Sequence, residues 1–369
     1  MVSVLRSDMM QMPHEPKAPS LIPPDKVWSH SPNGVRDEEL VYRLPRSEVL
    51  PFLIEQTSFM QTSASPANEA SRRVIYQEQY PHLHGPIEPL GPSASWSAED
   101  VAREVRAFVE HYATAHLDSR FVKIGHTPVL EDHVYTDGEL TLPHAIVLGL
   151  PMRYEDTNAA PEPKAGEEVT RNYMELGGLT LALGTWLRER GYAAEVHHPR
   201  GDKEMNCEAL FIPHAIAAGF GELGRHGSMI SREFGPRIRL SMITTDAPIP
   251  KAQPQDHGVD EFCSWCTKCL TACPVDAIPD ERTTQRGSYR FVIDTSACLP
   301  YFAETDGCGI CIAVCPYNKA DEAGSEKLVD QILSLDWVKQ AGERKRTDGI
   351  EAMEHYVAEQ KAARRSTPD

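Results

Sequence analysis

The chain has 369 residues, of which 37 are basic and 54 are acidic, so its formal net charge at pH 7 is −17. This length allows one large core and a small second module. The acidic excess disfavours nucleic-acid binding, because neutralising phosphates requires Lys and Arg. No apolar run of signal-peptide length begins the chain, and no stretch of eighteen apolar residues occurs in it. We therefore expect a cytoplasmic protein without a membrane span.

Residues 1–95 are rich in Pro and lack hydrophobic periodicity, which predicts an extended arm with short helices lying over the core. Pro-rich disorder is the alternative interpretation of this segment. Ser97 and Asp100 have the spacing of a capping box, and an apolar stripe follows them, so a helix is predicted to begin here. Apolar runs at 121–124 and 145–150 predict strands, the second of them central and buried.

Leucines at helical spacing predict a long helix over 167–190, which Gly191 ends. A helix of small residues over 209–218 and a strand over 237–245 complete the predicted core. Residues 326–340 and 350–362 are predicted helices that pack back as a cover. The fold class is therefore an α/β (α+β) domain and a cysteine-rich module. The expected boundaries are 1–95 for the arm, 96–254 for the domain, 255–325 for the module and 326–369 for the cover.

Eight of the nine cysteines lie in two blocks, each ending in Cys-Pro, as in bacterial ferredoxins. There, three cysteines of one block and the fourth of the other hold each 4Fe–4S cluster. We expect the first cluster on Cys263, Cys266, Cys269 and Cys315. We expect the second on Cys273, Cys298, Cys308 and Cys311. Disulfides suit small secreted chains and structural zinc usually uses paired cysteine spacings, so both alternatives are less favoured.

A glycine-rich run, GFGELGRHG, follows the predicted helix at 209–218. Closely spaced glycines can bring backbone N–H groups to an anionic ligand, so we interpret the run as cofactor-binding. The residues concerned are Gly219, Gly221, Gly224, Arg225 and Gly227. The run is not a dinucleotide fingerprint, because it follows a helix rather than a strand. A structural turn is the alternative.

The motifs in 221–227, 232–240 and 245–248, together with the second cysteine block, resemble the cobalamin-dependent reductive dehalogenases. The resemblance runs from about Ala145 to Tyr317. It implies a nitroreductase-like domain that binds cobalamin, followed by a ferredoxin-like module with two 4Fe–4S clusters. Epoxyqueuosine reductase, a tRNA-modifying enzyme, shares both parts and is the second candidate. That family typically has Gly-Ser-Trp where this chain has Gly-Pro-Arg at 235–237, which favours the dehalogenases.

The resemblance also implies site residues: a tyrosine proton donor at Tyr173, a polar partner at Asn206 and an arginine at Arg239. Lys203 is the alternative to Asn206, because the segment before it is longer than usual. Arg237 is the alternative to Arg239, because strand alternation would put both on one face. A tyrosine hydroxyl is protonated at neutral pH, and a nearby arginine stabilises the phenolate left after donation. A core tyrosine and a surface arginine are the structural alternatives.

The implied function is removal of halide from a small organohalide by Co(I) cobalamin, with electrons fed through the two clusters. No Asp-x-His-x-x-Gly segment occurs, so base-off cobalamin without a protein ligand is allowed. No fused reductase is visible, so we expect a separate ferredoxin, flavodoxin or reductase as the electron donor. A non-enzymatic iron–sulfur electron-transfer protein is a third hypothesis. We expect structural roles for Cys207, His197, His198 and His214.

Overall fold

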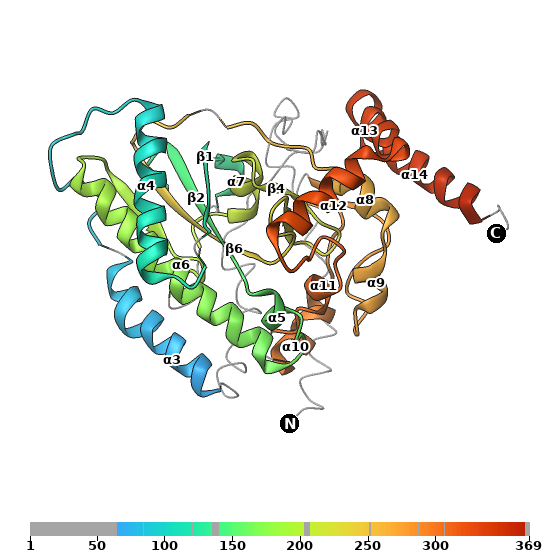
Figure 1. Ribbon diagram of the computed structural model, residues 1–369, viewed down its shortest axis with the longest axis horizontal. Coiled ribbons are helices and arrows are strands. Elements are labelled where there is room, and N and C mark those ends of the chain that lie inside the picture. Colours follow the sequence, from blue (N-terminus) through green and yellow to red (C-terminus); the bar gives the residue numbers. More distant parts are fainter. Residues whose placement is uncertain are drawn as a thin grey trace.

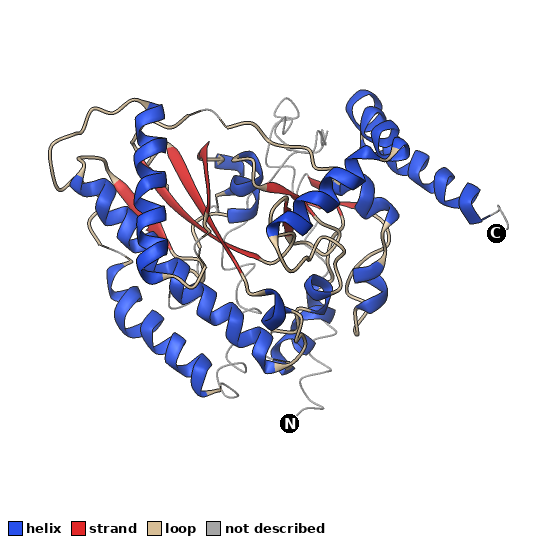
Figure 2. Ribbon diagram, viewed as in Figure 1, coloured by secondary structure: helices blue, strands red, loops and turns tan. Residues whose placement is uncertain are grey.

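The computed structural model describes most of the chain after Pro66, and Figures 1 and 2 show the arrangement of its elements. The described residues are 65–83, 85–119, 121–134, 140–202, 207–250, 252–285, 288–305 and 307–365. Most of the predicted arm lies outside these ranges, as do Lys203 and Asn206.

A four-stranded antiparallel sheet forms the centre of the fold, in the order β1-β2-β6-β3. The strands are β1 (Lys123–Pro128), β2 (His144–Pro151), β3 (Ala194–His197) and β6 (Ile238–Thr245). Strand β2 lies between two neighbours and is buried along almost its whole length, as predicted. Because every pairing is antiparallel, the mixed fold is of the α+β kind.

Helices cover both faces of this sheet, since successive side chains of a strand point to opposite faces. On one face, α4 (Ala98–His116) and α6 (Pro163–Glu189) pack against the alternate residues Ile146, Leu148 and Leu150. On the other, α7 (Phe211–Ala217) packs against Ala145 and Val147. The capping box predicted at Ser97 and Asp100 begins α4.

Helix α6 is the longest element and carries Tyr173. It follows the short α5 (Tyr154–Thr157) and ends before Gly191, whose φ of +81° lies in the left-handed region that glycine favours. The first described segment, α3 (Pro66–Val74), η1 (Ile75–Gln79) and η2 (Tyr80–His82), packs along α6. This described part of the arm thus forms short helices that lie over the core.

The cysteine-rich module follows a small hairpin, β4 (Gly221–Leu223) and β5 (Met229–Ser231). Its helices are α8 (Val259–Trp265), α9 (Lys268–Ala272), α10 (Thr295–Glu304) and α11 (Ile310–Ala313). A second hairpin, β7 (Thr283–Gln285) with β8 (Ser288–Arg290), lies between α9 and α10. A short 3-10 helix, η3 (Glu131–His133), follows β1 in the core.

Three C-terminal helices pack against the module, as the predicted cover requires. They are α12 (Glu322–Ser334), α13 (Asp336–Asp348) and α14 (Ile350–Arg365). The prediction of one unbroken helix over 326–340 is wrong. Leu335 adopts an extended backbone with ψ of 127°, and this ends α12 before α13 begins.

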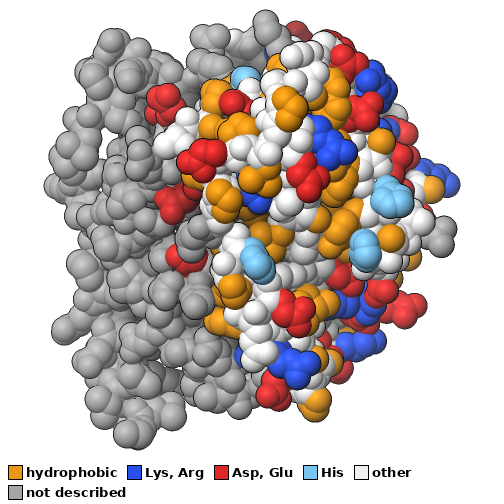
Figure 3. Space-filling view, turned by 90° about the vertical axis from the view of Figure 1, so that its left-hand side faces the viewer, with side chains coloured by type: hydrophobic (Ala, Val, Ile, Leu, Met, Phe, Trp, Pro, Cys, Tyr) orange, Lys and Arg blue, Asp and Glu red, His pale blue; other side chains and the backbone are white. Residues whose placement is uncertain are grey.

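None of the helices in the described ranges combines the length and apolar character that a membrane crossing requires. On the face shown in Figure 3, Lys and Arg side chains are scattered among acidic and hydrophobic ones rather than gathered in one patch.

Candidate functional site

The four cysteines expected for the first cluster line one pocket. Cys263 comes from α8, Cys269 from α9, and Cys315 follows α11. Cys266 ends α8 and completes the set. Burial raises the pKa of Cys263 to about 12, so iron must bind for this thiol to ionise at neutral pH. Four convergent thiols in one buried pocket fit a 4Fe–4S cluster.

The thiols of the other four cysteines also lie close enough to affect one another's pKa. Burial and, to a smaller extent, the nearby thiols of Cys308, Cys298 and Cys273 together raise the pKa of Cys311 to about 12. Cys269 of the first set adds to the same shift, so the two cysteine sets lie close together. This grouping is the one expected for the second cluster, with Cys273 crossing over from the first block.

The second cysteine block lies against the beginning of α6. A side chain at Gly309 would contact Ala160, and one at Gly307 would lie 3.8 Å from the Cα atom of Gly166. The loop around Cys308 therefore lies close to the beginning of the helix that carries Tyr173. Tyr173 is seven residues after Gly166, which is about 10 Å along a helix.

Tyr173 and Arg239, predicted from segments far apart in the sequence, lie together. The Arg239 guanidinium carbon is 5.4 Å from the centroid of the Tyr173 ring. Both side chains are half-buried. The Nε atom of Arg239 is buried and has no hydrogen-bond partner among the described residues. An unsatisfied buried donor beside a tyrosine is a place where a polar ligand can bind.

Arg237 has a different environment from Arg239, although only one residue separates them. It precedes β6, is buried, and its guanidinium donates to the main-chain carbonyls of Met152 at 2.6 Å and Lys319 at 2.8 Å and 3.1 Å. Arg237 thus joins the core to the segment after the second cysteine block. Strand alternation does not apply to it, because β6 begins at Ile238.

The glycine run forms the β4–β5 hairpin, and its turn conformations match the structural alternative. Gly219 and Gly227 have φ of +81° and +76°. The amide groups of Gly219, Gly224 and Gly227 donate to Ile216, Ser228 and Gly224 within the chain. Gly221 has no room for a side chain, since a Cβ atom there would lie 2.0 Å from the Ile230 carbonyl oxygen.

Arg225 faces the module. Its guanidinium donates to the carbonyls of Cys263 at 2.8 Å, Asp280 at 2.7 Å and Pro279 at 2.9 Å, and stacks on Phe291. Arg225 therefore supports the first cluster pocket, which it also lines, and the cofactor-binding role of the whole run stays a prediction.

The histidines singled out in the sequence are buried and bonded internally. His214 Nδ1 donates to the Leu210 carbonyl at 2.7 Å, and its Nε2 accepts from the Leu130 amide at 3.0 Å. His197 lies 3.0 Å from the Thr244 hydroxyl, and His198 lies 3.0 Å from the Gln79 side-chain oxygen. Burial lowers the pKa of His214 to about 4, so this ring is neutral at neutral pH. His197, His198 and Cys207 line a separate small pocket.

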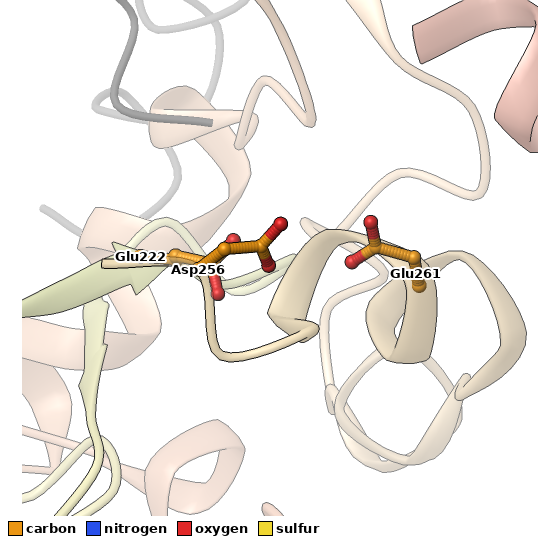
Figure 4. Close-up of side chains that lie close together, drawn as sticks. All are labelled: Glu222, Asp256 and Glu261. Carbon is orange, nitrogen blue, oxygen red and sulfur yellow. The ribbon is translucent and has the colours of Figure 1, made fainter. Parts of the chain in front are cut away.

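A cluster of acidic residues, Glu222, Asp256 and Glu261, was not anticipated from the sequence. Figure 4 shows their carboxyl groups facing a shared space, and their oxygens lie within 4.8 Å of one another. The ammonium of Lys345 lies 2.8 Å from Glu261, 3.7 Å from Glu222 and 3.6 Å from Asp256. A side-chain cation therefore offsets part of the negative charge of this cluster.

His226 and Tyr317 were also missed, and both line the first cluster pocket. His226 Nε2 and the Tyr317 hydroxyl are buried without a hydrogen-bond partner among the described residues. The available signals were the histidine inside the glycine run and the tyrosine directly after Cys315-Pro316.

Comparison with known proteins agrees with this architecture. Residues 262–318 match a family described as a 4Fe-4S double cluster binding domain. The chain is 33% identical over 219 residues to tetrachloroethene reductive dehalogenase from Sulfurospirillum multivorans. The match covers 55% of this chain and 42% of that protein. In this region the chain is similar in sequence to reductive dehalogenases.

Other matches support this relationship. The sequence is 32% identical over 189 residues to tetrachloroethene reductive dehalogenase from Dehalobacter restrictus, covering 48% of this chain and 33% of that one. The structure of a catabolic reductive dehalogenase superposes with a TM-score of 0.68 at 22% identity, over 88% of this chain and 46% of the other. The second family is also represented, since epoxyqueuosine reductase from Lactococcus garvieae is 34% identical over 112 residues, 28% of this chain and 31% of that protein. The chain spans less than half the length of the curated dehalogenases that it matches.

Proposed function

We propose that the chain is an oxidoreductase that removes halide from a small organohalide. In this reaction a carbon–halogen bond breaks, two electrons and one proton are consumed, and a carbon–hydrogen bond and a halide ion are formed. The single observation that carries the proposal is the contact between Tyr173 and Arg239. This contact brings a tyrosine hydroxyl and a guanidinium together on a core that is joined to a module similar to 4Fe-4S double cluster domains.

Cobalamin is the cofactor that this reaction implies, since one structurally similar protein is described as performing B12-dependent dehalogenation. The described residues fit a polar group bound beside Tyr173, because the buried Nε of Arg239 lacks a partner among them. When bound, the corrinoid supplies a strongly reducing cobalt centre, and the clusters supply electrons one at a time.

The side chains of the chain perform the proton chemistry. Tyr173 donates its hydroxyl proton to the carbon that loses the halide. Arg239 lies next to the ring and stabilises the phenolate that remains, which lowers the barrier to donation. Asn206, with Lys203 as its alternative, is retained as the proposed polar partner of this pair. Helix α6, which packs on the sheet, fixes the position of Tyr173.

Electrons come from a separate ferredoxin, flavodoxin or reductase. The contact of the Cys308 loop with Gly166 supports delivery from the second cluster toward Tyr173. The four cysteines of the second set are all partly exposed: Cys273, Cys298, Cys308 and Cys311. In the first set, three of the four cysteines are buried.

The test is halide release by the anaerobically reconstituted chain, supplied with cobalamin and a low-potential reductant, from a panel of halogenated phenols and alkenes. We expect Tyr173→Phe to lower turnover by at least about 100-fold, the lower end of the range for general acid catalysis. Tyr76→Phe is the matched control, because Tyr76 is also half-buried and stacks on an arginine, Arg200, at 5.2 Å. Unchanged turnover in Tyr173→Phe would show that the proton comes from elsewhere.

The epoxyqueuosine reductase match makes a second assay necessary. The same preparation is given an RNA stem-loop that contains epoxyqueuosine. Reduction of this RNA without halide release from any organohalide would replace dehalogenation by epoxide reduction. Failure to retain cobalamin would leave electron transfer through the clusters as the function.

A further inference from the structure

The first cluster pocket contains a hydrogen-bond donor that the proposed reaction does not use. His226 lies in the turn between β4 and β5, outside the cysteine blocks, and its side chain is 7% exposed. It lines the same pocket as Cys263, Cys266, Cys269 and Cys315.

The tautomer of His226 follows from its local contact. Nδ1 accepts a hydrogen bond from the main-chain amide of Ser228 at 3.2 Å. A neutral imidazole that accepts at Nδ1 carries its hydrogen on Nε2. This Nε2 is buried and has no partner among the described residues. Buried donors are almost always bonded, so a partner absent from the protein atoms is expected here.

The hairpin is shaped to hold the ring in this place. A Cβ atom at Gly224 would lie 2.8 Å from His226 Cε1 and 3.1 Å from Nε2, so only glycine leaves room for the imidazole. Gly227, with φ of +76°, permits the turn that follows. Arg225, between Gly224 and His226, donates to the carbonyl of the cluster ligand Cys263 at 2.8 Å and 3.1 Å. The Gly-Arg-His-Gly run therefore fixes His226 relative to the first cysteine set.

We propose that His226 Nε2–H donates a hydrogen bond to a sulfur atom of the first 4Fe–4S cluster, and that this bond raises the reduction potential of that cluster. Hydrogen bonds to cluster sulfurs stabilise the reduced form, which carries more negative charge. His226 is a positioning and tuning residue rather than a ligand. The inference requires the first cluster and is independent of the proposed dehalogenation.

The first experiment is a redox titration of the anaerobically reconstituted full chain, followed by electron paramagnetic resonance. In His226→Leu, we expect the equilibrium constant for reduction of one cluster to fall about tenfold, a shift of about 59 mV to more negative potential for one electron. The other cluster should keep its potential. His226→Gln, which retains an N–H donor, should restore most of the difference.

His257→Leu is the matched control. His257 is 4% exposed and also has a buried Nε2 without a partner among the described residues, but it does not line the cluster pocket. Its substitution should leave both potentials unchanged. Equal shifts in the two leucine variants, or no shift in His226→Leu, would overturn the proposal.

A measurement on the unmutated chain covers the case in which His226→Leu loses its cluster. Protein labelled with ¹⁵N-histidine is reduced, and the nitrogen coupled to the cluster spin is detected by pulsed electron paramagnetic resonance. A weakly coupled histidine nitrogen with an exchangeable proton supports the hydrogen bond. The absence of any histidine coupling to either cluster contradicts it.

Discussion

Two regions of the molecule hold cations that are buried or half-buried, and they differ in how those cations are paired. At the interface between β4, α8 and α13, Lys345 lies within 3.7 Å of carboxylates from Glu222, Asp260 and Glu261. On the sheet, Arg239 stacks on Tyr173 with its Nε unpartnered among the described residues. A buried cation whose partners all belong to the chain stabilises the fold. One that keeps an open donor is available to a ligand.

The largest effect is expected from Lys345→Met. This change leaves three carboxyl groups that are at most 1% exposed without their shared cation. Removing one partner of a buried ion pair typically costs about 3–5 kcal/mol, because uncompensated charge remains in the interior. Chemical denaturation should show a loss of this size in the free energy of unfolding.

Lys339→Met on the same helix is the control. Lys339 is 60% exposed and pairs with Asp336, which is 92% exposed, so its removal should change stability by less than about 0.5 kcal/mol. Similar losses in the two variants would mean that the buried network does not stabilise the interface.

The second prediction separates two arginines that the sequence left as alternatives. Arg237→Met removes three hydrogen bonds to main-chain carbonyls and leaves the Met152 and Lys319 oxygens without that donor. It should lower the free energy of unfolding by about 2–4 kcal/mol. Arg239→Met should cost less than about 1 kcal/mol but lower halide release by at least about tenfold, if the cation stabilises the Tyr173 phenolate.

Thermal unfolding and turnover measured on both variants test this division. The opposite pattern, with Arg239→Met unstable and Arg237→Met inactive but stable, would exchange the two roles.

The parts predicted well from the sequence depend on local spacing. The capping box at Ser97, the end of α6 at Gly191 and the central position of β2 each follow from neighbouring residues. The cysteine sets also follow from spacing, and only the crossover of Cys315 and Cys273 joins distant positions.

What the sequence could not predict depends on contacts between distant segments. Arg237 and Arg239 are two positions apart, so a strand pattern read from the sequence places both on the same face. Only the start of β6 at Ile238 and the bond of Arg237 to the Lys319 carbonyl distinguish their environments. Lys345 is one of two lysines in a helix that carries many charged residues. Its burial results from the packing of α8 and β4 against α13, which the sequence of α13 does not indicate. The contacts of Arg225 could not be predicted from the glycine run, because the carbonyl groups to which it donates lie more than thirty residues away.

The smallest predicted effect uses pH to probe the same interface. Burial raises the pKa of Glu222 from its ordinary value of 4.5 to about 8. Lys345 opposes this shift, whereas the carboxyl groups of Asp256, Asp260 and Glu261 add to it. Between pH 4.5 and 8 the folded chain therefore holds a proton that the unfolded chain has released. The contribution of Glu222 to stability is present below pH 4.5 and is lost as pH rises toward 8.

Glu222→Gln fixes the neutral state and keeps an oxygen that can accept from the amides of His257 and Val259. Relative to the unmodified chain, this variant should gain stability as the pH rises from 5 to 8. Glu343→Gln, at an exposed position of α13, should show no such change with pH. A difference that stays constant across this range would mean that Lys345 keeps Glu222 ionised throughout. Glu222 and Lys345 would then form an ion pair at this interface. Protonation of Glu222 would not contribute to the stability of the packing between the module and the core.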